Sequence, residues 1–306
     1  MERFTVTSSN GTTQLAAYKL VPQNPIAMVQ ISHGMCEYFL RYEGFAEYLA
    51  NLGFLVFGHD HLGHGNSAPS PEDLGFIASS GGAGMLIEDV HLLSLEMKSQ
   101  YPHLPLVLFG HSMGSFISRA VLEIYGEDYA ASVICGTGGP ETPAAAGKAL
   151  ASLLIKLKGE RHRSRLLAGF AFAGYNKKYE KGCDKNAWLT RDTNLVERYN
   201  ADPFCAYTFT LRAYRDLFRL VQHVSRKEWA KKYPAELPTL IVSGEMDPVG
   251  DCGKGVKKAY ESFLKAGMRD VSIQLYPELR HEILCEAERQ TVFEDIFRWL
   301  KPHLPV

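Results

Sequence analysis

Residues 106–114 read Leu-Val-Leu-Phe-Gly-His-Ser-Met-Gly. The first four form an apolar run that is too short for a helix and typical of a buried strand, and Ile117, Ala120 and Ile124 then recur at helical spacing. Gly-x-Ser-x-Gly between a strand and a helix is characteristic of a sharp turn that exposes its serine. The two glycines relieve crowding in such a turn, and the helix N-terminus favours developing negative charge. We therefore predict that Ser112 is a nucleophile.

The same kind of short apolar run recurs on both sides of this turn. The additional predicted strands are residues 27–31, 54–57, 132–135, 240–242 and 271–275. Segments with helical periodicity separate them, and strand–helix alternation predicts a mostly parallel sheet with helices on both faces. An Asn-Gly pair at residues 10–11, between two β-prone runs, predicts an N-terminal hairpin.

The alternation stops between residues 138 and 237, where helical periodicity dominates and strand signals are few. We predict an α/β catalytic core at 1–137 and 238–306, with residues 138–237 inserted as a helical cap. An apolar stripe in the cap is flanked by cations, among them Lys156, Lys158 and Arg161; its residues are Leu150, Leu153, Leu154 and Leu157. The leucines either pack on the core, with the cations simply solvated, or make transient contact with a lipid surface.

A serine nucleophile needs a base, and the base needs an orienting acid. In a sheet of this type the chain order is Ser, acid, His, and the groups follow strand ends. Asp247 follows the strand at 240–242 and His281 follows the strand at 271–275, so we predict them as acid and base. Glu245 and Asp251 are rival acids in the same loop. His111, within the serine turn, is expected to be structural.

The tetrahedral intermediate of such a reaction requires two backbone N–H donors for its oxyanion. Met113, directly after the predicted nucleophile, supplies one. The loop after the strand at 27–31 should supply the other, and Gly34 lets that loop turn so that the Met35 N–H becomes the donor. His33 in the same turn is expected to be a structural hydrogen-bonding residue.

A histidine-rich segment at residues 59–67 could at first be taken for a zinc site, with His59, Asp60, His61 and His64 as ligands. Its D-x-x-G-x-G-x-S spacing fits a tight turn held by side chain-to-backbone bonds better, so we predict no metal. Cys36 and Cys285 lie near the predicted site in sequence, but no base accompanies either, so both are expected to be buried or incidental thiols.

The 306 residues are 46% hydrophobic and 22% charged, which is ordinary for a globular protein with a sizeable core. A net charge of −1 gives no reason to expect nucleic-acid binding. No run of 18 apolar residues and no secretory signal is present, and the six cysteines are scattered. A reduced cytoplasmic protein is the resulting expectation.

Three motifs together resemble one enzyme branch. They are H-G-x-x-E-x-x-x-R-Y (33–42), L-V-F-x-H-D-H-x-G-H-G-x-S (55–67) and G-H-S-M-G (110–114), which are similar to the monoglyceride lipase and lysophospholipase branch of the α/β hydrolases. In the cap, W-L-T-R-D (188–192) and Y-N-A-D-P (199–203) resemble bacterial lysophospholipase-like hydrolases. The resemblance implies the α/β-hydrolase fold and no metal or organic cofactor. It also implies a triad and an oxyanion hole made by Ser112, Asp247, His281, Met35 and Met113.

The first functional hypothesis is a serine hydrolase that cleaves the carboxylic ester of a monoacyl lipid, either a monoacylglycerol or a lysophospholipid. The alternative is a general carboxylesterase or amidase on smaller or amide-linked acyl substrates. A third hypothesis, from another class, is a non-catalytic binding module on a hydrolase scaffold, which the intact Ser, Asp and His argue against. The expected partner is a small acyl ester or lipid, with no nucleic acid.

Overall fold

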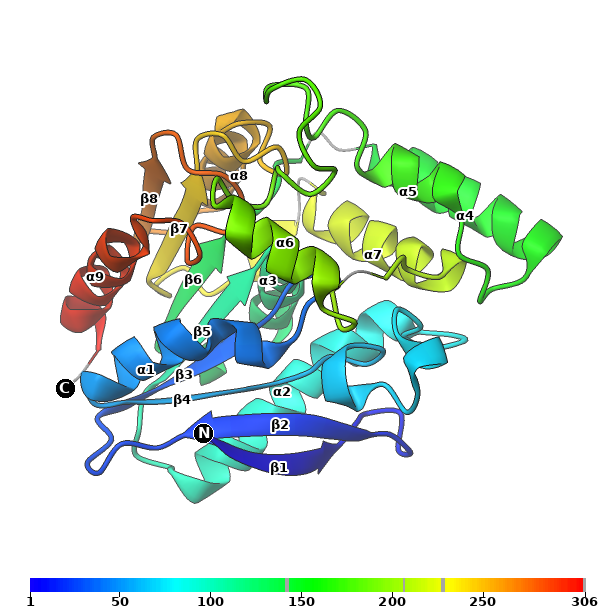
Figure 1. Cartoon of the computed structure of the whole chain (residues 1–306). Coiled ribbons are helices and arrows are strands. Elements are labelled where there is room, and N and C mark those ends of the chain that lie inside the picture. The colour runs from blue at the N-terminus through cyan, green and yellow to red at the C-terminus, as the bar shows by residue number, and fades with distance from the viewer. Residues whose placement is uncertain (141–142, 206, 227–228, 305–306) are drawn as a thin grey trace.

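The computed structural model describes residues 1–140, 143–205, 207–226 and 229–304. Its centre is one eight-stranded sheet in the order β1-β2-β4-β3-β5-β6-β7-β8 (Figure 1). The strands are β1 (Glu2–Thr7), β2 (Gln14–Leu20), β3 (Ala27–Ser32), β4 (Phe54–His59), β5 (Leu106–His111), β6 (Ala131–Cys135), β7 (Thr239–Gly244) and β8 (Val271–Tyr276). The β1–β2 and β2–β4 pairs are antiparallel and the other pairs are parallel. The predicted α/β-hydrolase fold, with a mostly parallel sheet, is confirmed.

The central strands are apolar along their whole length because both of their faces are covered. In β5, Leu106 and Leu108 belong to one buried cluster, whereas Val107 and Phe109 belong to a second cluster on the opposite face. This follows from the two-residue repeat of a strand, which sends successive side chains to opposite faces. β8, at the sheet edge, is only partly buried, which agrees with its alternating sequence.

Helices cover the sheet on both faces (Figure 1). Apolar residues of α1 and α9 fill one cluster, and those of α2, α3 and α8 contribute to the other. The helices are α1 (Glu43–Asn51), α2 (Gly82–Gln100), α3 (Met113–Tyr125), α4 (Ala144–Lys158), α5 (Arg165–Ala171), α6 (Thr193–Ala201), α7 (Leu211–Val224), α8 (Lys254–Lys265) and α9 (Arg289–Leu300). None of the helices in the described ranges has the length and apolar content needed to cross a membrane.

Four of these helices, α4 to α7, lie between β6 and β7, in the segment predicted as a cap (Figure 1). α7 packs on α3 and α2, and α4 packs mainly on α7, so α7 separates α4 from the sheet. The predicted leucine stripe on α4 is therefore divided. Leu154 is buried, but Leu153 and Leu157 are 55% and 70% exposed, because α7 covers only one side of the helix.

Candidate active site

Ser112 lies at the junction of β5 and α3 with a φ of 54° and a ψ of −119°. A non-glycine residue with positive φ is strained, and such strain concentrates at functional turns. The neighbouring positions must be glycine because a side chain would not fit at either of them. A Cβ on Gly110 would lie 2.5 Å from the Gly114 carbonyl oxygen, and one on Gly114 would overlap the Ser32 carbonyl. Gly110 is therefore required by the turn itself, whereas Gly114 is required because β3 approaches it closely.

His281 and Asp247 meet although 34 residues separate them in the sequence. The loops after β8 and β7 bring the His281 Nδ1 to 2.9 Å from the Asp247 Oδ2, and both side chains are almost completely buried. The Asp247 carboxylate also accepts from the Val249 N–H at 2.8 Å and the Ser243 hydroxyl at 3.2 Å. These bonds fix the carboxylate, which in turn orients the imidazole and leaves its Nε2 available.

The two rival acids are not brought to the histidine. Glu245 and Asp251 are both exposed to solvent, whereas Asp247 is buried. Asp251 also adopts a φ of 48°, which places it in a tight turn between Pro248 and the start of α8. Within the described ranges, His281 is hydrogen-bonded to Asp247 and to neither rival.

The two predicted oxyanion donors lie next to the serine. The loop after β3 approaches so closely that a Cβ on Gly34 would lie 3.0 Å from the Ser112 Cβ. Met35 and Met113 both line the cavity that contains Ser112. Within the described part of the chain, neither of their N–H groups donates to a protein acceptor. Two unpaired amides beside a serine are the arrangement that stabilises an oxyanion.

The histidine-rich segment supports the loop that carries Met35. The His33 Nε2 accepts from the His61 N–H at 2.9 Å, while its Nδ1 donates to the Gly34 carbonyl at 2.8 Å. Burial lowers the pKa of His33 to about 3, so the ring is neutral and structural. Asp60 accepts from the backbone N–H groups of Phe39 and Asn66.

These bonds agree with the tight-turn interpretation of the segment. In the described ranges, no three His, Cys, Asp or Glu side chains are grouped as metal ligands.

A buried charged network behind the histidine was not predicted from the sequence. Arg41 pairs with Glu37 at 2.8 Å and binds both carboxylate oxygens of Glu282 at 2.7 and 2.8 Å. Burial alone would raise the pKa of Glu37, but the hydrogen bond to His111 and the charge of Arg41 outweigh it and hold that pKa well below its ordinary value. Glu37 lies before the short helix at Phe39–Tyr42 that contains Arg41, so the i, i+4 rule for helices did not predict this pair. Glu282 is 241 residues from Arg41, so the sequence did not indicate this ion pair either.

His111 belongs to this network and contacts His281 directly. Its Nδ1 lies 2.8 Å from the Tyr42 hydroxyl, and its Nε2 lies 3.3 Å from the His281 carbonyl oxygen. Burial lowers the pKa of His111, but the adjacent Glu37 more than offsets this and raises it above the ordinary value. His111 therefore holds the backbone of the candidate base, consistent with the structural role predicted for it.

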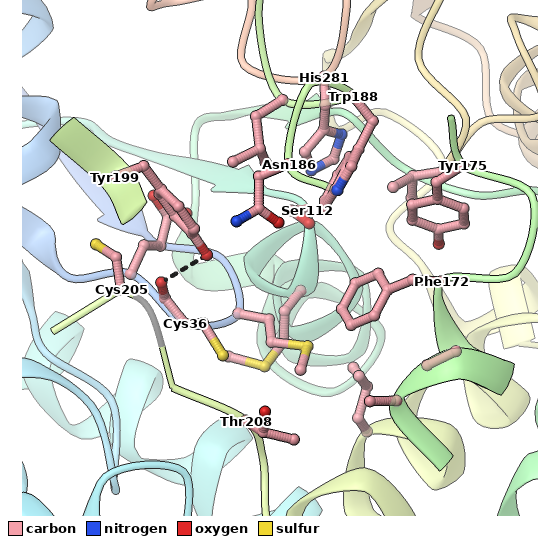
Figure 2. Close-up of a pocket in the computed structure, with 18 of the residues that line it drawn as sticks. Cys36, Ser112, Phe172, Tyr175, Asn186, Trp188, Tyr199, Cys205, Thr208 and His281 are labelled. Carbon is pink, nitrogen blue, oxygen red and sulfur yellow. Dashed lines mark hydrogen bonds between the residues drawn. The ribbon is translucent and has the colours of Figure 1, made fainter. Parts of the chain in front are cut away.

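A cavity of about 400 Å³ opens in front of Ser112 and His281 (Figure 2). Much of its wall comes from the segment predicted as a cap, whose aromatic lining residues are Phe172, Tyr175, Trp188, Tyr199, Tyr207, Tyr214 and Phe218. Cys36 also lines the cavity, where burial raises the pKa of its thiol and its Sγ donates to the Tyr207 carbonyl at 3.4 Å. Burial likewise raises the pKa of Cys285. Both thiols therefore stay protonated.

Comparison with known proteins places the chain among hydrolases. The family model described as "Serine aminopeptidase, S33" matches residues 23–288. A monoacylglycerol lipase of Mycolicibacterium smegmatis is 27% identical over 284 residues, covering 92% of this chain and 90% of the relative. The monoglyceride lipase of Homo sapiens is 28% identical over 286 residues, covering 90% and 82%.

A solved structure agrees with these sequence relatives. A thermostable carboxyl esterase from Bacillus coagulans, in complex with glycerol, superposes with a TM-score of 0.92 at 28% identity and covers 98% of both chains. The family match spans both parts of the sheet and the segment between them. The chain therefore belongs to the serine aminopeptidase S33 family of α/β hydrolases.

Proposed function

We propose that this protein hydrolyses the carboxylic ester of a monoacyl lipid, a monoacylglycerol or a lysophospholipid, through an acyl-Ser112 intermediate. The observation that carries the proposal is the placement of Ser112 and His281 together at the wall of one largely apolar cavity (Figure 2). An apolar pocket with a few convergent polar groups is typical of a small-molecule site. The monoglyceride lipases among the relatives supply the substrate class.

The residues support a two-step acyl transfer. In the first step the Ser112 Oγ attacks the ester carbonyl carbon while its proton passes to the His281 Nε2. The oxyanion accepts from the Met35 and Met113 N–H groups, and the imidazolium is stabilised by the buried Asp247 carboxylate. When the ester C–O bond breaks, His281 returns the proton to the departing alcohol.

In the second step, water loses a proton to His281 and attacks the acyl carbon. Collapse of the second tetrahedral intermediate breaks the bond to the Ser112 Oγ, which regains the proton from His281 and releases the free acid. The steps use only water, side chains and backbone N–H groups of this chain, so no cofactor or metal is invoked.

The cap is proposed to select the acyl chain, with residues 138–237 as the cap and 1–137 with 238–306 as the catalytic core. Its aromatic side chains make the wall that faces Ser112, and Phe172 and Tyr175 project into the cavity beside it (Figure 2). One acyl chain packed on these rings gains apolar burial, and a second chain would need additional space.

A general carboxylesterase is the competing function, favoured by the close superposition on the Bacillus coagulans carboxyl esterase. A substrate panel separates the two. Turnover would be measured on monoacylglycerols and lysophospholipids of increasing acyl length, short-chain esters and matched acyl amides, each with and without excess EDTA. Our proposal expects the highest kcat/KM on long-chain monoacyl esters, unchanged by EDTA. Faster turnover of short esters or amides favours the alternative.

The panel also covers the two remaining hypotheses. Loss of activity in EDTA that zinc restores would support a zinc site formed by His59, His61 and His64. A fluorophosphonate probe that fails to label Ser112, together with no turnover of any substrate, would leave a binding module as the remaining interpretation.

We further propose that the cap touches lipid surfaces transiently. Leu153, Leu157 and Leu166 are 55%, 70% and 65% exposed on neighbouring helices α4 and α5. Lys156, Lys158 and Arg165 are exposed on the same two helices. Apolar side chains surrounded by cations suit the interface of an anionic membrane.

Arg161, which the sequence grouped with these cations, is already paired with the core. It pairs with Asp73 at 2.8 Å and its guanidinium lies 3.8 Å from the centre of the Phe76 ring.

Replacing Lys156, Lys158 and Arg165 with glutamine tests the contact. Each cation near an anionic surface contributes about 1 kcal/mol, so the triple change should weaken vesicle binding by on the order of 100-fold at low salt. The measurement is co-sedimentation with vesicles of anionic phospholipid, alongside kcat/KM on a water-soluble short-chain ester, which should not change.

A charge-matched variant provides the control. Lys257, Arg289 and Lys301 are exposed on other elements, and their replacement with glutamine alters net charge equally. If both triple variants lose vesicle binding to the same extent, only net charge matters and the cap is not the contact surface.

A further inference from the structure

Residues between 179 and 199 of the cap are bonded to three loops of the proposed active site, namely the oxyanion loop after β3, the acid loop after β7 and the histidine loop after β8. On the oxyanion loop, the Tyr199 hydroxyl donates to the Cys36 carbonyl at 3.1 Å, next to Met35 (Figure 2). On the acid loop, the Tyr179 hydroxyl donates to the Met246 carbonyl at 2.6 Å, next to Asp247. These bonds join the cap to backbone groups directly adjacent to the proposed catalytic residues.

The histidine loop is joined to the cap through its backbone. The His281 N–H donates to the Trp188 carbonyl at 3.3 Å, and the Glu282 N–H donates to the Leu189 carbonyl at 2.7 Å. The Trp188 ring also packs on the imidazole, with centroids 4.9 Å apart. Two consecutive cap residues thus run alongside the candidate base and the residue after it.

A buried carboxylate holds the two segments together. Glu286 is 1% exposed and accepts from the Arg280 N–H at 3.0 Å and from the backbone N–H and the Nε of Arg191, both at 3.2 Å. The Arg280 guanidinium in turn donates to the Ala187 carbonyl at 2.6 Å and the Thr190 carbonyl at 3.2 Å. Arg280 directly precedes His281, so this cluster fixes the chain on which the candidate base is mounted.

The opposite side of the histidine is fixed by the core. His111 contacts the His281 carbonyl, and Arg41 holds Glu282 with two charge-assisted bonds. The candidate base therefore lies between two rigid attachments, one from the core and one from cap residues 187–191. Removing the cap attachment leaves the loop with support on one side.

We propose that cap residues 187–191 position His281, with Arg191 and Glu286 as the positioning residues. The inference rests on the proposed function, since it concerns the general base assigned there. Catalytic geometry must be held to within about 0.5 Å, and a misplacement of about 1 Å can cost on the order of 100-fold in rate. The cap thus contributes to the chemical step as well as to the acyl pocket.

Two variants test the proposal. Glu286→Gln removes the negative charge that accepts from the Arg191 Nε and from the backbone N–H of Arg280, and Arg191→Met removes the Nε donor while its backbone N–H remains. Each should lower kcat by about 10- to 100-fold on both a long-chain monoacylglycerol and a short water-soluble ester, with little change in KM. Arg191→Lys, which keeps the positive charge beside Glu286, should recover part of the lost kcat.

A matched control breaks a cap-to-core ion pair elsewhere. Arg161→Met removes the pairing with Asp73, and within the described ranges neither residue lines the cavity. Its kcat on the short ester should equal that of wild type. Each kcat is calculated from the concentration of active sites titrated with a fluorophosphonate, so unfolded protein does not lower the measured value. The Arg191 side chain is 31% exposed, so its replacement should be tolerated by the fold. If Glu286→Gln fails to fold, the proposal is therefore tested with Arg191→Met alone.

Two results would overturn the positioning role. One is kcat unchanged within about twofold on both esters in folded variants, which is smaller than any misplacement effect. The other is a raised KM confined to the long-chain ester, which would make the segment a pocket wall. Failure of the proposed function is separate, because it would appear as retained activity in Ser112→Ala, whatever the Arg191 variants do.

Discussion

Ser112→Ala is expected to lower kcat by on the order of 10⁶, equivalent to about 8 kcal/mol of transition-state stabilisation. The hydroxyl is the atom that forms the proposed acyl bond, and alanine leaves nothing in its place. Folding should be little affected, because within the described ranges the Ser112 hydroxyl makes no hydrogen bond to another protein group. The measurement is kcat on the best ester of the panel, together with the thermal unfolding midpoint.

Ser118 on the same helix is the matched control. Its hydroxyl is buried without a hydrogen-bond partner in the described ranges, so Ser118→Ala loses only a hydroxyl that contributes no bond. That variant should keep wild-type kcat and equal or greater stability. If Ser112→Ala retained more than about a tenth of wild-type kcat, a loss far too small for a nucleophile, another residue would have to form the acyl bond.

Asp247→Asn is expected to lower kcat by on the order of 10⁴. The Asp247 Oδ2 accepts from the His281 Nδ1, which places the free lone pair on Nε2, where the serine proton must arrive. An amide nitrogen at that position would donate to Nδ1 instead and move the ring proton to Nε2. The wrong tautomer then faces the serine. The measurement is kcat on the same ester, with the folded fraction checked by thermal unfolding.

Glu245→Gln and Asp251→Asn are the controls for this prediction, because each removes one charge from the same loop. Both side chains are exposed, so each change should leave kcat near that of wild type. If Glu245→Gln or Asp251→Asn lowered kcat strongly while Asp247→Asn lowered it only slightly, the residue with the strong effect would be the acid instead. The contact between His281 and Asp247 would then be structural only.

The secondary structure could be read from the sequence because it depends on short-range regularities. Six apolar runs predicted β3 to β8 within a few residues, and the Asn-Gly turn predicted the β1–β2 hairpin. The turn at Ser112 was recognised from its local Gly-x-Ser-x-Gly motif, although the space that Gly114 leaves is needed by Ser32 on β3. Strand, turn and helix preferences act over windows of no more than about 18 residues, so they can be detected in a single sequence.

The identity of the acid could be narrowed but not decided from the sequence. Glu245, Asp247 and Asp251 all follow β7, and the strand end alone does not separate them. Burial separates them in the fold, because only the Asp247 side chain turns inward to His281 while the other two face solvent. Side-chain direction within a loop depends on the neighbouring chain, which lies far away in sequence.

The segment predicted as a cap shows most clearly what only the tertiary structure decided. Its helical character followed from periodicity, but the partners of its charges did not. Arg161, which the sequence grouped with the cations flanking the leucine stripe, pairs with Asp73 across 88 residues, and Arg191 reaches Glu286 across 95. An ion pair forms where folding brings two charges into contact, and sequence periodicity holds no information on distances between elements. The sequence alone determined the elements and the candidate nucleophile, whereas packing between distant segments decided which residues hold the candidate base in place.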